Sequence, residues 1–226
     1  MHPQLPLPFR LQEDFNFDNF ISSENQLIIG SLKDTSEPFV FLWGDSGTGK
    51  THLLQAICQE QTEQRKTAAY LPLRELHMLP AQILDGMDGL DLICLDDIEL
   101  ISGKNDWEEA VFNLFNQIKQ AGGRLIVGSK ASPQQAHIQL NDLKSRLNSG
   151  LALNLAPLSD ENTILALQNR AKKLGLELNH EVAQFMLTRL PRDLCSLWHL
   201  IDKLDRASLA AQRKLTIPFV KLILLN

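Results

Sequence analysis

The stretch GDSGTGKT, from Gly44 to Thr51, directly follows the apolar run PFVFLW at residues 38–43. It satisfies the pattern G-x-x-x-x-G-K-[ST], in which glycines allow the backbone N–H groups of a loop to point inward at phosphate oxygens. The helical pattern KTHLLQAICQEQ begins at Lys50 and would add the positive end of a helix. A glycine turn without a ligand is the alternative, but the setting between a strand and a helix favours a phosphate-binding loop.

The residue types of this loop predict how a nucleotide would be held. Lys50 would reach the outer phosphates, and the hydroxyl group of Thr51 would hold Mg²⁺. His52 would pack in the helix beside the nucleotide. The expected nucleotide-binding residues of this stretch are Gly44, Asp45, Ser46, Gly47, Thr48, Gly49, Lys50, Thr51 and His52.

A pair of acidic residues completes the predicted site. The apolar run DLICLDD, residues 91–97, ends in Asp96 and Asp97. An acid at the carboxyl end of a strand beside a phosphate loop can hold the metal, and the next acid can polarise the attacking water. We assign Asp96 to the metal and Asp97 to the water. Acids also cap turns, so the assignment depends on the phosphate loop that precedes it in the chain.

Short apolar runs alternate with helical patterns up to about residue 155, which predicts a parallel α/β sheet covered on both faces. From Leu158 onward the pattern is helical only. The expected fold is a five-stranded α/β module at residues 11–156, a small all-helical lid subdomain at 157–226 and an extended tail at 1–10. The expected strands are 38–43, 67–73, 91–96, 124–129 and 151–155, and the helix at 106–120 would stop at Gly122.

Composition places the 226-residue chain among ordinary globular proteins, with 44% hydrophobic and 22% charged residues. Its net charge of -5 gives no general attraction toward nucleic acid. Cys58, Cys94 and Cys195 form no C-x-x-C pair, which favours free thiols in a reducing compartment. Without an apolar run of roughly 18 residues or a signal-peptide pattern, we expect a cytoplasmic protein with no membrane partner.

The N-terminal stretch QLPLPF carries three large apolar side chains in a segment that cannot form a helix. Proline lacks the backbone N–H group and pushes the residue before it into an extended conformation. Such a segment can fill the pocket of a partner or fold back onto its own sheet. The three large apolar side chains are those of Leu5, Leu7 and Phe9.

Two arginines have unusual positions. Arg146, in NDLKSRLNSG, ends a short helix just before the last expected strand, where an arginine is usually a solvated charge. Arg192, in LPRDL, opens a helix, which is an electrostatically poor place for a cation unless a phosphate lies nearby.

Taken together, these motifs resemble those of an AAA+ module. Their residue sequences are similar to the motifs of the DnaA-related proteins of bacterial replication. The stretches GKTHLL, LDDIELI, LKSRL and PRDL carry this resemblance, as does FDNF at residues 17–20. The stretches LDGM (84–87), PLSDE (157–161) and LDRASLAAQRKLTIPFVK (204–221) are similar to the DnaA-related regulators that shut initiation off. The resemblance implies that Phe17, Phe20 and Ile21 belong to the base pocket and that Arg192 is a phosphate-sensing arginine of the lid.

The resemblance further implies a negative regulator of chromosomal replication initiation. Such a regulator binds ADP, or another nucleoside diphosphate or ATP, with Mg²⁺ and docks through Gln4, Leu5, Leu7 and Phe9 on the sliding clamp, the beta subunit of DNA polymerase III. Arg146 is then an arginine finger offered in trans to ATP held by DnaA. DNA would be met indirectly through the clamp, and a homo-oligomer is compatible with the pattern.

Two departures predict slow hydrolysis by the chain itself. Asp97 stands where AAA+ proteins usually have a glutamate, and Lys130 stands where DnaA-like proteins usually have an acid. The alternatives are an autonomous P-loop ATPase that remodels DNA or loads a helicase, and a clamp-binding scaffold with a vestigial nucleotide site.

Overall fold

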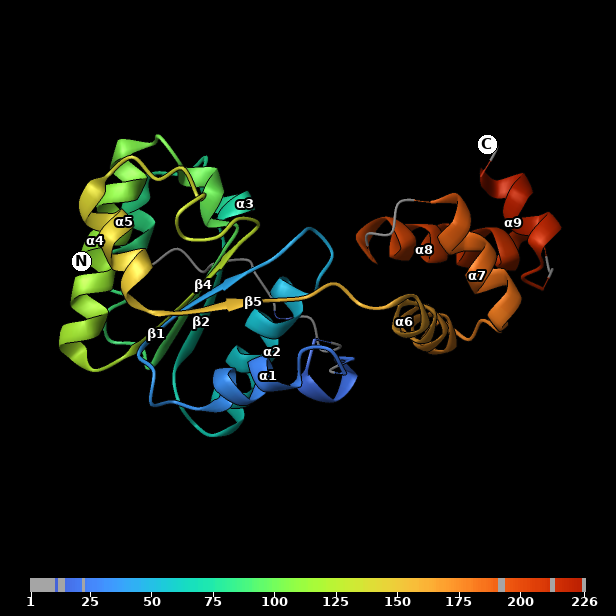
Figure 1. The fold of residues 1–226 in the computed structure, drawn as a ribbon, viewed down its shortest axis with the longest axis horizontal. Coiled ribbons are helices and arrows are strands. Elements are labelled where there is room, and N and C mark those ends of the chain that lie inside the picture. The colour runs from blue at the N-terminus through green and yellow to red at the C-terminus, as the bar shows by residue number, and fades with distance from the viewer. Residues whose placement is uncertain (1–10, 12–14, 22, 191–193, 212–213, 225–226) are drawn as a thin grey trace. The chain divides into compact units, whose positions relative to one another are not determined.

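The computed structural model describes residue 11 and residues 15–21, 23–190, 194–211 and 214–224. The chain forms two compact units whose main boundary lies between Leu155 and Ala156 (Figure 1). No helix in the described ranges is long and apolar enough to cross a membrane.

The first unit is an α/β sandwich around a five-stranded parallel sheet with the order β2-β3-β4-β1-β5. This confirms the predicted fold class. The strands are β1 (Phe39–Trp43), β2 (Ala68–Pro72), β3 (Leu92–Asp96), β4 (Arg124–Ser129) and β5 (Leu151–Asn154). Its helices are η1 (Phe17–Asn19), α1 (Gln26–Lys33), α2 (Lys50–Glu63), α3 (Leu73–Leu76), η2 (Ala81–Leu84), η3 (Ile98–Ile101), α4 (Asn105–Ala121) and α5 (Asn141–Ser149).

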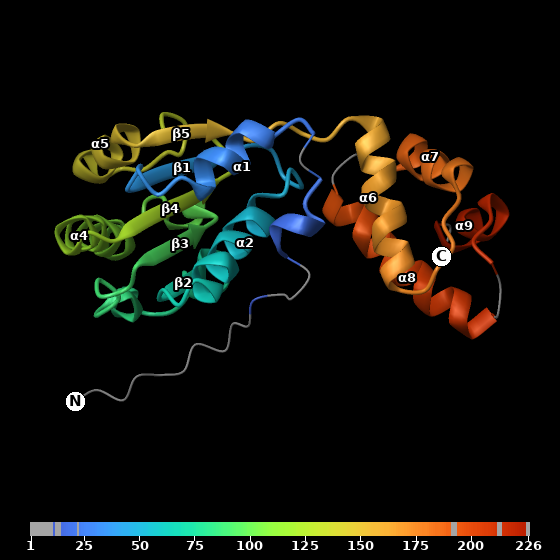
Figure 2. The ribbon, with the colours of Figure 1, turned by 90° about the horizontal axis from the view of Figure 1, so that it is seen from below.

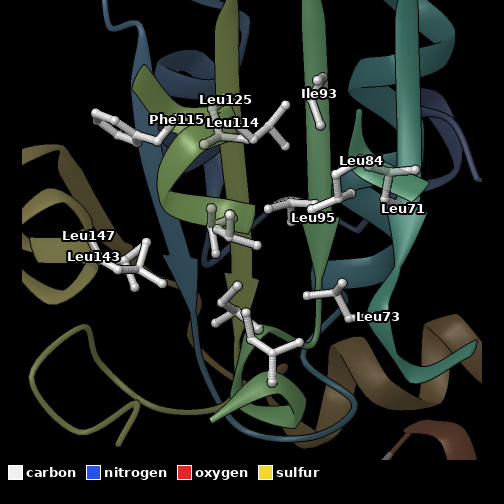
Figure 3. Packing of buried hydrophobic residues seen from close by; sticks show 14 of the residues in the cluster. Leu71, Leu73, Leu84, Ile93, Leu95, Leu114, Phe115, Leu125, Leu143 and Leu147 are labelled. Carbon is white, nitrogen blue, oxygen red and sulfur yellow. The ribbon is translucent and has the colours of Figure 1, made fainter. Parts of the chain in front are cut away.

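The sheet is buried on both faces because successive side chains of a strand point to opposite sides. In β1, Phe39 and Phe41 pack against the helices α4 and α5, whereas Val40 and Leu42 pack against α1 and α2. Figure 2 shows these two helix layers with the sheet between them. Figure 3 shows the cluster on the α4 side, in which leucines and a phenylalanine from the strands and helices interlock. Burial of each of these leucine side chains contributes about 1.5–3 kcal/mol to the free energy of folding.

Helix α4 ends where the sequence predicted, at Gly122, whose φ of 77° is left-handed and therefore favours glycine. Helix α1 was not among the predicted elements. Its sequence QLIIGSLK contains a glycine and is only eight residues long, and it depends on packing against α2.

The second unit consists of helices, as the sequence predicted. They are α6 (Asp160–Lys173), α7 (His180–Arg189), α8 (Leu194–Ala211) and α9 (Ile217–Leu224). The side chains of Ser159 and Asn179 cap α6 and α7 by accepting hydrogen bonds from the backbone N–H groups of Asn162 and Val182. The apolar faces of the four helices share one core that includes Leu167, Met186, Ile201 and Val220.

A buried carboxylate anchors the loop that leads into α5. Glu108, on α4, is 1% exposed and accepts hydrogen bonds from the backbone N–H groups of Gly103 at 2.7 Å, Gln139 at 3.0 Å and Leu140 at 2.6 Å. Leu140 is the residue before the first turn of α5. Glu108 therefore fixes the position at which α5 begins.

We predict that Glu108→Ala lowers the free energy of unfolding by about 3 kcal/mol, because three backbone N–H groups lose a charged acceptor. Urea unfolding followed by circular dichroism measures the change. Glu109→Ala, at an exposed position of the same helix, is the matched control and should stay within about 0.5 kcal/mol of the wild type. Equal stability of the two variants would contradict the anchoring role of Glu108.

Candidate functional site

The phosphate-binding loop of the sequence lies at the carboxyl end of β1 and runs into α2. The φ angles of Gly47 and Gly49 are 81° and 99°, in the region that favours glycine. Gly49 is the residue that caps the N-terminus of α2. The N–H group of Gly44 donates to the carbonyl of Ser129 at 3.2 Å, which ties the loop to the end of β4.

The Lys50 side chain binds the backbone at the start of the loop. Its ammonium group donates to the carbonyls of Gly44 at 2.7 Å and Asp45 at 2.8 Å, and the residue is 6% exposed. Burial lowers the pKa of Lys50, while the nearby negative charge of Asp96 acts in the opposite direction. The ammonium group therefore lies at the base of the loop, at its junction with β1.

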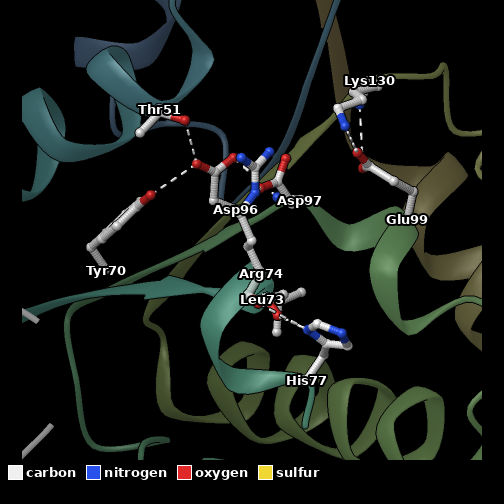
Figure 4. Close-up of polar contacts among 9 residues, drawn as sticks. All are labelled: Thr51, Tyr70, Leu73, Arg74, His77, Asp96, Asp97, Glu99 and Lys130. Carbon is white, nitrogen blue, oxygen red and sulfur yellow. Dashed lines mark hydrogen bonds and ion pairs between the residues drawn. The ribbon is translucent and has the colours of Figure 1, made fainter. Parts of the chain in front are cut away.

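Asp96 is the centre of a polar cluster on the ends of the strands (Figure 4). One carboxylate oxygen accepts hydrogen bonds from the hydroxyl groups of Thr51 at 2.6 Å and Tyr70 at 2.9 Å. The other accepts from the N–H group of Asp97 at 3.0 Å. The carboxylate has room because β4 has Gly128 beside it, where a Cβ atom would lie 2.8 Å from an Asp96 oxygen.

Burial raises the pKa of Asp96, which is 2% exposed, and the neighbouring charge of Asp97 adds to this effect. The hydrogen bonds from Thr51 and Tyr70 act in the opposite direction because they stabilise the carboxylate. Burial also raises the pKa of Tyr70, and the Asp96 charge adds to it, so Tyr70 is a neutral donor. Asp96 is thus a desolvated acid that its neighbours keep oriented.

The Asp97 side chain forms an ion pair with a surface cation. Its backbone is left-handed, with φ 59°, and its carboxylate accepts from the Nε atom of Arg74 at 3.1 Å (Figure 4). The Arg74 side chain is 66% exposed, so this ion pair adds little stability. The role of Asp97 in orienting water stays a prediction.

A second ion pair lies beside the cluster. The Lys130 ammonium group is 3.8 Å from a carboxylate oxygen of Glu99, and the N–H group of Lys130 donates to the other oxygen at 3.3 Å. The charges of Asp96, Asp97 and Glu99 raise the pKa of Lys50 against the effect of burial, and that of Lys130 lowers it. The structure therefore adds Tyr70, Arg74 and Glu99 to the residues that the sequence predicted.

One of the predicted base-pocket residues, Phe20, lies next to His52. The Phe20 ring packs edge-on to the His52 ring, with centroids 5.3 Å apart, and Phe17 belongs to η1. Ile21 follows Phe20 and is partly buried. The structure thus brings Phe20 to the start of α2, and its role in a base pocket stays a prediction.

Arg146 lies away from this cluster, in the last turn of α5. Its guanidinium group is 5.5 Å from the centre of the Phe115 ring of α4. Helices α4 and α5 cover one face of the sheet and α2 the other, so Arg146 and Lys50 belong to opposite layers (Figure 2). The remaining predicted residues, Gln4, Leu5, Leu7, Phe9 and Arg192, lie outside the described residues.

The donors at the site suit Mg²⁺. The hydroxyl group of Thr51 and the carboxylate of Asp96 lie within hydrogen-bond distance of each other and are hard oxygen ligands. Among the described residues no group of three or more His, Cys, Asp or Glu side chains could hold a metal ion. Mg²⁺ is usually bound by one or two protein ligands together with phosphates and waters.

The phosphate loop after β1, the acid at the end of β3 and the helical second unit define the class of the protein, a P-loop AAA+ module. Residues 11–154 match the model of the bacterial DnaA ATPase domain, and residues 160–224 match the model described as Hda, lid domain. The chain belongs to this family and is an Hda-like, DnaA-related AAA+ protein.

Individual relatives agree with this assignment. An uncharacterised protein of Haemophilus influenzae is 42% identical over an alignment of 229 positions that covers 99% of each chain. Domain III of the replication initiation protein DnaA from Thermotoga maritima has the same fold, with a TM-score of 0.84 and 24% identity over 96% of this chain and 98% of that one. AMPPCP-bound DnaA from Aquifex aeolicus also has this fold, with a TM-score of 0.72 and 24% identity over 88% of this chain and 67% of that one.

The raised pKa of Asp96 predicts a pH-dependent stability. The folded chain holds the Asp96 proton more tightly than the unfolded chain, so the wild type loses stability as the pH rises from the ordinary aspartate range through the raised pKa. Asp96→Asn removes this titration. As the pH rises above the ordinary aspartate range of about pH 4, the stability of the variant should therefore increase relative to the wild type until the Asp96 carboxyl group is ionised.

Urea unfolding across this range, with a chelator and without nucleotide, measures the difference between the two curves. Asp85→Asn, at an exposed position, is the matched control and should follow the wild type. Parallel curves for the wild type and Asp96→Asn would contradict the burial argument.

Proposed function

We propose that the protein is a nucleotide-bound negative regulator of replication initiation, which docks on the DNA-loaded sliding clamp and promotes ATP hydrolysis by DnaA. The observation that carries the proposal is the pairing of a DnaA-type ATPase module with an Hda-type lid in one chain. The polar cluster of Lys50, Thr51 and Asp96 supports the nucleotide part. The position of Arg146 supports the part that concerns a partner.

A nucleoside diphosphate, with ADP as the expected form, would lie along the loop. The ammonium group of Lys50 and the backbone N–H groups of residues 44–49 would bind its phosphates. Thr51 and Asp96 would hold Mg²⁺, which neutralises phosphate charge. In support, a DnaA of the same fold has been solved with AMPPCP bound. Arg192, which follows the lid helix α7, would add a second cation to the phosphates.

The geometry around Arg146 supports a role outside its own nucleotide site. Arg146 belongs to the layer of α4 and α5, whereas the phosphate loop leads into α2 on the other face. A cation near a transferring phosphoryl group stabilises the negative charge that spreads over its oxygens. Arg146 therefore suits a finger that is offered to ATP held by a neighbouring DnaA molecule.

The tail, QLPLPF, would bring the chain to its place of action. Leu5, Leu7 and Phe9 would fill an apolar pocket of the clamp, and Gln4 would bind at its edge by hydrogen bonds. A segment stiffened by proline loses less entropy when it binds. DNA would be contacted through the clamp.

A substitution of Lys50 tests the nucleotide site. Lys50→Ala should weaken ADP binding at least about tenfold, because a buried cation that faces the phosphates is lost. Calorimetry with ADP and Mg²⁺ measures the affinity, and Lys66→Ala, at an exposed position beyond α2, is the control. A wild type that binds no nucleotide would refute this part of the proposal.

Turnover by the isolated chain separates the proposal from the alternative of an autonomous P-loop ATPase, which the complete GDSGTGKT motif permits. We expect slow hydrolysis. A rate near the enzyme median of about 10 per second would favour the alternative.

Substitutions of Arg146 test its role as an arginine finger. Arg146→Ala should reduce the stimulation of DnaA-bound ATP hydrolysis by roughly 10³-fold or more, because a finger supplied in trans contributes that much to the rate. Arg146→Lys should also be impaired, since an ammonium group lacks the rigid fork of donors of a guanidinium group. Hydrolysis is measured with DNA-loaded clamp at matched occupancy.

Lys144→Ala, an exposed change on the same helix α5, is the matched control and should stimulate normally. Deletion of residues 1–9 should abolish clamp binding and leave ADP binding nearly unchanged. Full stimulation by Arg146→Ala would refute the arginine-finger role and leave Arg146 as an ordinary surface charge.

A further inference from the structure

The start of helix α2 carries a buried histidine that the phosphate chemistry does not use. His52 is 8% exposed and follows Lys50 and Thr51, which face the predicted phosphates and metal. Its Nε2 atom lies 2.7 Å from the carbonyl oxygen of Asn16. A carbonyl oxygen can only accept a hydrogen bond, so Nε2 carries a proton and donates it. His52 thereby joins α2 to a segment more than thirty residues earlier in the chain.

The ring of His52 binds the same segment on two further sides. The Phe15 ring stacks on it with a centroid distance of 4.8 Å and an interplanar angle of 13°. The Phe20 ring meets it edge-on at 5.3 Å and 74°. Both arrangements are preferred geometries for aromatic pairs. One imidazole therefore holds the segment at both ends of η1.

The segment lies directly on the phosphate loop through Phe20. A Cβ atom added to Gly49 would be 2.7 Å from the Phe20 ring, so the ring packs against the bare Cα atom of this glycine. Gly49 is the last loop residue before Lys50 and has a φ of 99°. The contact explains why this position needs a glycine for space as well as for its backbone conformation.

A second tether holds the same segment from the side. The Lys33 ammonium group lies 4.2 Å from the centre of the Phe17 ring and 2.7 Å from a carboxylate oxygen of Glu60 on α2. This contact is more exposed, with the Lys33 side chain 42% accessible. The buried link through His52 is the one that lies next to the loop.

From these contacts we infer that His52 is a positioning residue that latches residues 15–20 onto the phosphate loop and so sets the affinity for the base of a bound nucleotide. The inference rests on the proposed nucleotide binding and deepens it. Phosphates in the loop bring the attached ribose and base next to Phe20, and an aromatic wall binds a base only where it is held in place. His52 acts through this wall rather than by touching the base.

Two substitutions separate the hydrogen bond from the bulk of the side chain. In His52→Gln the amide nitrogen can take the place of Nε2 and donate to Asn16, whereas the side chain of His52→Asn is too short to reach. Calorimetry compares the binding of ADP with that of pyrophosphate, which has no base. We expect His52→Asn to lose about tenfold in ADP affinity and to bind pyrophosphate like the wild type, and His52→Gln to retain most of the ADP affinity.

Hydrogen exchange of the nucleotide-free chains provides a second readout. The latch predicts faster exchange of the amides of residues 15–21 in His52→Asn than in the wild type or His52→Gln, with unchanged exchange in β1 and β3. Equal losses for ADP and pyrophosphate, or equal ADP affinity in all three proteins, would overturn the latch. A wild type without any ADP affinity would instead overturn the proposed function, and the inference with it.

Discussion

The geometry of the site depends on one desolvated carboxylate. Asp96 is nearly inaccessible to water, so it stays in place only because the hydroxyl groups of Thr51 and Tyr70 and the N–H group of Asp97 supply hydrogen bonds. These groups come from three different parts of the chain. They meet because parallel strands end at the same edge of a sheet. The Asp96 side chain therefore depends on the pairing of β2, β3 and β4, which brings its partners together. It also depends on Gly128, which leaves room for the carboxylate.

In the proposed function, the two faces of the sheet would carry two different tasks. On one face, α2 carries the residues that face a nucleotide and, through His52, the segment that borders it. On the other face, α4 holds α5 at both ends, with the Glu108 carboxylate at its start and the Phe115 ring under Arg146. In the proposed function, a change in the α4 and α5 layer would therefore alter a partner's reaction without changing the affinity for the chain's own nucleotide.

Much of this arrangement follows from local sequence patterns. The strands are nearly continuous apolar runs, and the loop pattern GDSGTGKT fixes the residues that meet Asp96 once the strands are parallel. Tyr70, Arg74 and Glu99 could not be predicted, because their partners are set by the pairing of distant strands and by turns without a repeating pattern. The same applies to Arg124, which looks like the start of a strand but donates hydrogen bonds to the carbonyls of Ser31 and Leu32 at the end of α1. Contacts of this kind depend on the tertiary fold, so one sequence contains no local signal for them.

The position of β1 in the sheet also governs when the protein can fold as it is synthesised. β1 lies between β4 and β5, so both of its neighbours are made more than eighty residues after it. At ordinary ribosome speeds the strand waits roughly 5 to 20 seconds for its last partner. During this interval FVFLW is an uncharged, β-prone segment that the finished protein buries almost completely. The nascent chain is therefore most open to aggregation, and most in need of a chaperone, before Asn154 has left the ribosome.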